Sequence, residues 1–420
     1  MRRLLGSIAV DTTALRESRD FRLLTLGEVV TGLGTQASIV ALPYQVYILT
    51  RSPFLVGLIG LVELIPLVAL SLLGGAIADR MDRRRLLLLS QIALVVAAGG
   101  LAGLAYAGSP PLVAIYVLAA FNAGASAVER VVRSAMVPRL VGPAQLRSAL
   151  SFTFGMAQLT QVAGPALAGV LIAVSGVGTA YAVDAVTCAG MVLAALMMAP
   201  QPPEHDEEPE PVPEAIAAGL RFARRDGAIM GSFAIDLLAM TFGMPRALFP
   251  ALALGVYGAG AGGTGALFAA VSAGATVAAL TTGWLPHARW LGRIVIAAVT
   301  AWGAAIALAG LAGSIVVACV LFALAGAADS VSAVCRSTIL QTRAPEAMRG
   351  RLSALFSLVV TSGPRLGDVE SGGVASLVTV GTSVVSGGLA CVAGVGLIVL
   401  AFPELAAYDG AAIRPAVPAP

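Results

Sequence analysis

The strongest constraint on this chain is a series of long apolar stretches joined by short polar connections. A helix needs roughly 20 apolar residues to cross the hydrocarbon core of a bilayer. Only 12% of the 420 residues are charged, against roughly 25% in soluble proteins. We therefore predict an all-α integral membrane protein with twelve transmembrane helices. Their expected limits are 22–46, 54–77, 86–107, 112–134, 150–174, 179–199, 229–253, 264–286, 291–311, 315–338, 353–377 and 382–402.

Arginine gathers in alternate connections, and all 26 basic residues are arginine. The even-numbered connections hold most of them, for example Arg80 to Arg85, whereas the odd-numbered ones hold essentially Arg51 alone. Short loops rich in Lys or Arg stay cytoplasmic. We expect a multi-pass protein of the inner (plasma) membrane with both termini in the cytoplasm.

The centre of the chain, residues 200–214, is rich in proline and acidic residues. Such a composition favours a solvated linker. It is followed by an amphipathic stretch over 214–225. We expect an N-terminal six-helix half at 1–199, a cytoplasmic linker with a short helix at 200–228, and a C-terminal six-helix half at 229–420. The halves show weak self-similarity: Val132-Arg133-Ser134 ends the fourth span and Cys335-Arg336-Ser337 ends the tenth.

The connection between the second and third spans carries a glycine followed by charged residues: Gly75, Asp79, Arg80, Arg83 and Arg84. This pattern resembles the loop 2–3 signature of the major facilitator superfamily of secondary transporters, which usually has glycine where Asp82 stands. The resemblance implies a gate motif in which the Asp faces a helix end and the basic residues pair with carboxylates. We expect Glu129 and Arg133 to join it. A plain stop-transfer charge cluster is the alternative.

The fifth span contains Thr160, Gly164, Pro165 and Gly169. Proline bends a helix and small residues let a neighbour pack closely. The stretch resembles the Gly-Pro signature of the superfamily's antiporters, which implies a tight contact that limits leak. Ordinary small-residue packing is the alternative.

Several further motifs resemble the enterobactin (catecholate siderophore) exporter group of the same superfamily, above all Ile339-Leu-Gln-Thr-Arg-Ala-Pro-Glu-Ala-Met-Arg-Gly-Arg351. The resemblance implies the major facilitator fold of two pseudo-symmetric halves. It also implies secondary active export by alternating access, with proton antiport of a siderophore or a related small molecule. A macrolide or multidrug efflux pump is the alternative, and the direction of transport stays open.

Ionisable residues inside spans are costly and are functional candidates. The proton or substrate candidates are Glu28, Glu63, Asp184, Asp236 and Arg246. Glu28 and Asp236 lie in the first expected span of the N-terminal and the C-terminal half, respectively. The alternative for Glu63 and Asp184 is that both lie near helix ends, where their side chains reach water. Arg246 either attracts an anionic substrate or extends to the outer interface.

The chain offers little material for other chemistry. It has two histidines, no lysine, and four cysteines at no metal-ligand spacing. We expect no enzymatic activity, no metal and no cofactor, with the proton gradient as energy source. The expected partners are a small-molecule substrate and the lipid bilayer, with no nucleic acid, and we expect a monomer. The glycines of Gly260-x-Gly262-x-x-Gly265 match a dinucleotide fingerprint, but no strand is expected before them, so we predict a turn entering the eighth span.

Overall fold

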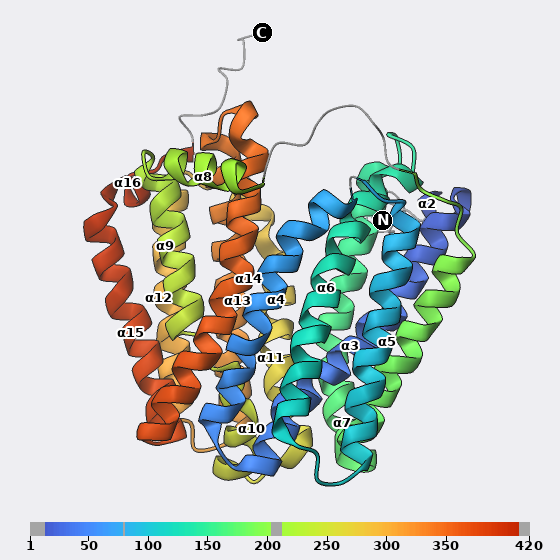
Figure 1. The fold of residues 1–420 in the computed structure, drawn as a ribbon. Helices are drawn as coiled ribbons and strands as arrows, with labels where there is room; N and C mark the ends of the chain where they lie inside the picture. Colours follow the sequence, from blue (N-terminus) through green and yellow to red (C-terminus); the bar gives the residue numbers. More distant parts are fainter. Residues whose placement is uncertain (1–12, 79, 203–211, 411–420) are drawn as a thin grey trace, which may run out of the picture. The chain divides into compact units, whose positions relative to one another are not determined.

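The computed structural model describes residues 13–78, 80–202 and 212–410, and these residues form helices joined by short turns (Figure 1). The chain divides into two compact units. Unit 1 comprises residues 1–42 and 62–209, and unit 2 comprises residues 43–61 and 210–420. The expected halves at 1–199 and 229–420 stay a prediction, because the tip of the first helical hairpin, residues 43–61, groups with unit 2.

Unit 1 is built from the start of one long helix, most of a second, and three further long helices. These are α3 (Arg19–Thr50), α4 (Pro53–Ala78), α5 (Arg83–Tyr106), α6 (Leu112–Leu140) and α7 (Leu146–Leu196), preceded by the short α2 (Thr13–Glu17). Helix α7 contains two arms, because Gly176 has φ 81° and ψ 170° in its middle. Only glycine adopts that conformation readily. The two arms correspond to the expected fifth and sixth spans.

The first helix of unit 2, α9 (Gly227–Phe242), ends before the expected limit of 253. A β-carbon on Gly243 would lie 2.3 Å from the indole nitrogen of Trp302, so the chain approaches that ring closely. Pro245 then follows, and it has no N–H for a helical bond. The path continues as η1 (Arg246–Leu248), α10 (Phe249–Ala251) and a π-helical turn, η2 (Leu252–Val256).

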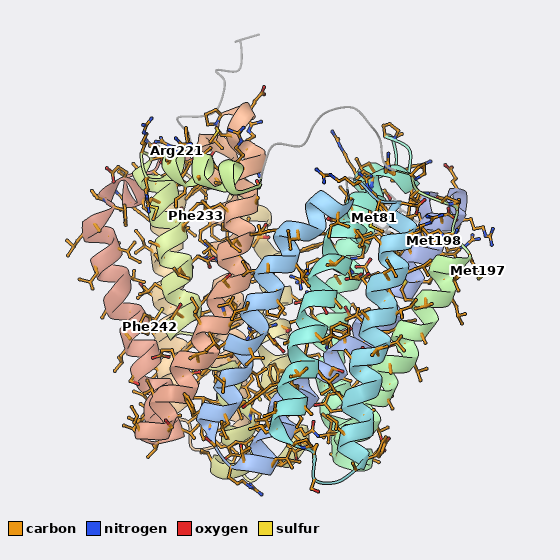
Figure 2. The ribbon with its side chains drawn as sticks, viewed as in Figure 1. Met81, Met197, Met198, Arg221, Phe233 and Phe242 are labelled. Carbon is orange, nitrogen blue, oxygen red and sulfur yellow. The ribbon has the colours of Figure 1, made fainter. Side chains whose placement is uncertain are left out.

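The remaining helices of unit 2 pack around two apolar cores: α8 packs on a smaller one, and the others pack around a larger one. They are α8 (Val212–Ala223), α11 (Gly260–Thr281), η3 (Thr282–His287), α12 (Leu291–Gly310), α13 (Ile315–Arg343), α14 (Glu346–Leu377), α15 (Val380–Ala401) and α16 (Pro403–Ala406). Trp302 and Phe322 are fully buried in the larger core. Helix α8, the expected amphipathic helix, lies across the ends of α9 and α14 (Figure 1). Phe233 of α9, which Figure 2 labels below α8, stacks on Phe356 of α14 with ring centroids 6.1 Å apart.

The tip of the first hairpin meets α14 within unit 2. A β-carbon on Gly57 would lie 2.3 Å from the carbonyl oxygen of Asp368, and one on Gly60 would lie 2.5 Å from that of Arg365. Gly372 approaches the backbone of Pro53 in the same way. Small residues allow helices to approach this closely in a membrane.

Among the described residues, ten helices are long and apolar enough to cross a membrane. One of them is the two-armed α7, which accounts for two expected spans. The expected span 353–377 lies in α14, which is not among the ten and holds Arg365, Asp368 and Glu370. Large apolar side chains face outward along the long helices: Leu280, for example, is 82% exposed. An outward apolar surface on helices of this length fits a lipid environment, so the all-α integral membrane fold is confirmed.

The glycine-rich stretch at 260–265 begins α11, as expected. Gly258 and Gly260 have φ of 63° and 58°, and the residues before them form the π-helical turn rather than a strand. The glycines that match the dinucleotide fingerprint therefore form a turn that leads into α11.

Candidate functional site

The first candidate cluster lies in unit 1, between α3 and α6. Arg133 Nη1 contacts Glu28 Oε1 at 2.6 Å, and Arg133 Nε lies 3.7 Å from Glu129 Oε1, one helical turn earlier. The side chains of Glu28 and Arg133 are 14% and 28% exposed. The second oxygen of Glu28, Oε2, is buried and has no hydrogen-bond partner.

The second cluster lies in unit 2, between α9 and α13. Arg336 forms an ion pair with Asp236, and their side chains are 3% and 1% exposed. Arg336 Nη2 also lies 3.4 Å from Asp329 Oδ1 on its own helix. Asp236 Oδ2 and Arg336 Nε are both buried without a hydrogen-bond partner. Burying a charge is costly unless it is paired, so Arg336 is what allows Asp236 to lie here.

The two clusters occupy matching places in the two sequence repeats. In each, a carboxylate from the first expected span of a half pairs with the arginine of the Arg-Ser repeat that ends the fourth span. The sequence singled out Glu28 and Asp236 as candidates, but we expected Arg133 in the gate motif. The described partners of Arg133 are Glu28 and Glu129, and the partner of Asp236 is Arg336.

Arg246 belongs to a different cluster in unit 2. It begins η1, and its charge and that of Arg365 act on Asp368 of α14. The buried Asp368 Oδ1 also accepts the N–H of Ala247 at 3.1 Å. Arg246 therefore lies beside an acidic group of its own unit. Its predicted role toward an anionic substrate stays a prediction.

Asp184 lies in the second arm of α7 and is 3% exposed. Ser38 Oγ donates to its Oδ2 at 2.5 Å, and Thr35 Oγ1 donates to its Oδ1 at 3.3 Å, both from α3. Cys188 Sγ is 3.6 Å from Oδ1. Asp184 is thus held by neutral donors in the interior, so the alternative that it reaches water is wrong. Glu63 of α4 is also buried, at 9% exposed.

The described residues of the gate motif contact backbone carbonyls. Arg84 Nε donates to Ala195 O at 2.8 Å, and its Nη2 donates to Leu196 O at 2.6 Å. Arg83 Nη1 is 3.4 Å from Ala135 O, whereas Arg80 is exposed. Asp79 and the surroundings of Gly75 lie outside the described residues. The expected gate role stays a prediction.

The antiporter-like motif packs against α3. Thr160, Gly164, Pro165 and Gly169 are all buried on the first arm of α7. A β-carbon on Gly164 would lie 2.5 Å from Gln36 Cβ, and Gly32 of α3 faces Thr160. The close helix contact that the motif predicted is present; its role in limiting leak stays a prediction.

An apolar cavity of about 550 Å³ lies beside this contact, inside unit 1. It is lined by α3 and both arms of α7, including Gly34, Gly164 and Thr187. Its walls are almost entirely hydrocarbon, so it suits apolar groups and offers no charged anchor.

Comparison with curated proteins finds relatives that match nearly the full chain. The enterobactin exporter EntS of Citrobacter koseri is 30% identical over 391 residues, covering 93% of this chain and 92% of that protein. The enterobactin exporter EntS of Shigella boydii is 30% identical over 371 residues, covering 88% of each.

Solved structures share the fold at low sequence identity. A POT family transporter in complex with 5-aminolevulinic acid matches with a TM-score of 0.74 at 11% identity, covering 92% of this chain and 97% of that one. A bacterial homologue of the iron transporter ferroportin matches with a TM-score of 0.70 at 17% identity, covering 92% and 98%. Residues 12–420 match the family described as transmembrane secretion effector. The chain belongs to this family, and it is a multi-pass efflux transporter of the major facilitator superfamily.

Proposed function

We propose that the protein is a proton-coupled exporter of a catecholate siderophore or a chemically related small molecule. Full-length similarity to two exporters named for enterobactin supports the substrate class. The alternative, a macrolide or multidrug efflux pump, shares the same fold and differs in substrate. Export across the inner membrane, with both termini cytoplasmic, belongs to this proposal.

One observation supports proton coupling. Glu28 and Asp236 each use one carboxylate oxygen for an arginine, and each keeps the other oxygen buried without a hydrogen-bond partner. A buried polar atom without a partner is unfavourable. Such an oxygen can accept a proton while the other oxygen stays beside the arginine. Both repeats thus contain a carboxylate that can gain and lose a proton inside the membrane.

The proposal is tested in proteoliposomes with an imposed proton gradient. We expect wild-type protein to move a catecholate siderophore against its gradient, and a protonophore to abolish that movement. Transport of macrolides, with no movement of the catecholate, would establish the alternative substrate.

Coupling is tested with Glu28→Gln, Asp236→Asn and the double variant, with Glu346→Gln as the control. Glu346 is a carboxylate whose side chain is 92% exposed, so its amide should leave transport unchanged. We expect each of the two buried amide variants to lose proton-driven export while facilitated substrate exchange continues. Full proton-driven transport by the double variant would place the coupling group elsewhere.

A further inference from the structure

The end of α11 presents an exposed apolar face that continues into a tryptophan. Val277 and Leu280 of α11 and Trp284 of η3 are all exposed. Residues three and four positions apart are neighbours on a helix surface, so these side chains follow one another along one face. Exposed apolar side chains on a spanning helix face lipid, and tryptophan is enriched where the bilayer meets water. The order of hydrocarbon and then indole therefore indicates that the bilayer surface lies near Trp284.

The connection after η3 brings two arginines to a second tryptophan. The Cζ atom of Arg293 lies 4.4 Å from the ring centroid of Trp290, and that of Arg289 lies 5.0 Å from it. A cation over an indole face is attracted by the ring. Because a guanidinium is planar and carries its N–H donors at its edge, contact with the ring holds it in place without using those donors.

The two arginines differ in their acidic neighbours. Arg289 Nε lies 2.8 Å from Asp409 Oδ2, and the carbonyl of Arg289 accepts the N–H of Gly410 at 2.8 Å. The chain after α16 thus fixes Arg289 and compensates its charge. Arg293 is exposed in the first turn of α12, which holds no acidic residue. Within the described parts of the chain, no carboxylate lies within ion-pair distance of Arg293. Its charge is therefore available to an anion.

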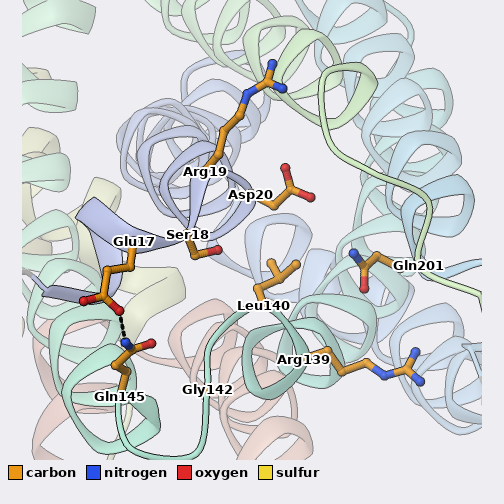
Figure 3. Close-up of a pocket in the computed structure, with 9 residues that line it drawn as sticks. All are labelled: Glu17, Ser18, Arg19, Asp20, Arg139, Leu140, Gly142, Gln145 and Gln201. Carbon is orange, nitrogen blue, oxygen red and sulfur yellow. Dashed lines mark hydrogen bonds between the residues drawn. The ribbon is translucent and has the colours of Figure 1, made fainter.

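A second group of arginines lacks this excess of charge. Arg19 and Arg139 line a polar cavity of about 580 Å³ in unit 1, but Glu17 and Asp20 line it as well (Figure 3). The acidic side chains of that cavity match its arginines in number, and no aromatic side chain is among its described lining residues. Arg19 is exposed and serves as a control for the loss of one positive charge.

We propose that the tryptophan–arginine patch, made of Trp284, Arg289, Trp290 and Arg293, binds the headgroup of an anionic phospholipid. The phosphate accepts N–H bonds from the edge of the Arg293 guanidinium, whose planar fork suits a phosphate. The acyl chains lie along the exposed apolar face of α11. A lipid matches the patch because the apolar face, the indoles and the charge follow one another within residues 277–293. This inference is independent of the substrate and of proton coupling.

The first test measures lipid preference with the full-length protein in phosphatidylcholine vesicles that contain brominated phosphatidylglycerol or brominated phosphatidylcholine. Quenching of tryptophan fluorescence reports lipid at Trp284 and Trp290, because the third tryptophan, Trp302, is fully buried. We expect wild type to prefer the anionic lipid, and Arg293→Gln to lower that preference about fivefold, the effect of one arginine near a membrane surface. Arg19→Gln should leave it unchanged. The same preference in wild type and Arg293→Gln, or an equal loss in both variants, would overturn the proposal.

The second test separates a membrane lipid from a soluble phosphate diester. Glycerophosphoglycerol carries the headgroup of phosphatidylglycerol without its acyl chains. Because a bilayer holds its headgroups at the patch at a high effective concentration, we expect an excess of the soluble diester to leave the quenching by brominated phosphatidylglycerol unchanged. Loss of that quenching on addition of glycerophosphoglycerol would assign the patch to a soluble ligand and refute the lipid site.

Discussion

The contact between Gly164 and α3 allows a quantitative prediction for Gly164→Ala. The new β-carbon would lie 2.5 Å from Gln36 Cβ and 2.7 Å from its Cγ. Because the β-carbon of Gln36 is fixed to its backbone, rotation of the side chain cannot relieve this clash, and the helices must separate. Overpacking of this kind costs typically about 1–3 kcal/mol. Alanine in a helix interior gains about 0.5–1 kcal/mol over glycine, so the net loss of stability is at most about 2.5 kcal/mol.

Gly155→Ala is the matched control, because Gly155 lies on the same arm of α7 and its β-carbon would meet nothing within 4 Å. For Gly155→Ala we therefore expect only the stabilisation of about 0.5–1 kcal/mol that alanine gives over glycine in a helix interior. Because both variants make the same Gly-to-Ala change, they should differ by the overpacking cost alone, about 1–3 kcal/mol, with Gly164→Ala the less stable. Denaturant unfolding of the purified protein in lipid–detergent micelles measures the difference. A Gly164→Ala variant as stable as Gly155→Ala would refute the close-contact argument.

Three other changes have expected outcomes. Arg336→Met leaves Asp236 charged and unpaired and should cost about 3–5 kcal/mol in the same unfolding assay; adding Asp236→Leu should recover most of the loss. Gly274→Ala would place a β-carbon 1.7 Å from the carbonyl oxygen of Ala323, so we expect no monodisperse peak in size-exclusion chromatography. Asp79→Asn, predicted from the sequence motif, should slow transport in vesicles while membrane insertion, measured by fractionation, stays normal.

Hydropathy and length predicted the membrane helices well, because a bilayer imposes both on any helix that crosses it. They also located the turn between the fifth and sixth spans, where Gly176 reverses the chain. The detail that they missed is a local backbone event in the seventh span. Gly243 and Pro245 break the seventh span beside Trp302. That break depends on a side chain almost sixty residues away in sequence.

The candidate carboxylates could be predicted singly, because charges within apolar spans are rare and conspicuous. Their partners could not, because pairing depends on which helices become neighbours. Arg336 lies 100 residues from Asp236. One sequence signal did exist. The Arg-Ser repeat marked Arg133 and Arg336 as equivalent, and the two carboxylates lie in the first expected span of each half. The hydroxyl partners of Asp184 left no comparable signal, since serine and threonine occur throughout the spans.

The arginines of the two pairs each have a second acidic neighbour, which bears on how the carboxylates can be neutralised. Glu129 precedes Arg133 by four residues, and Asp329 precedes Arg336 by seven, each on the arginine's own helix. If Glu28 or Asp236 takes a proton, its arginine would otherwise become an unpaired charge in a largely apolar interior, which costs several kcal/mol. The second carboxylate keeps that arginine partly compensated. Under the proposed coupling, each cluster can therefore gain and lose one proton while its arginine keeps an acidic neighbour. A pair of one carboxylate and one arginine would leave the arginine without one.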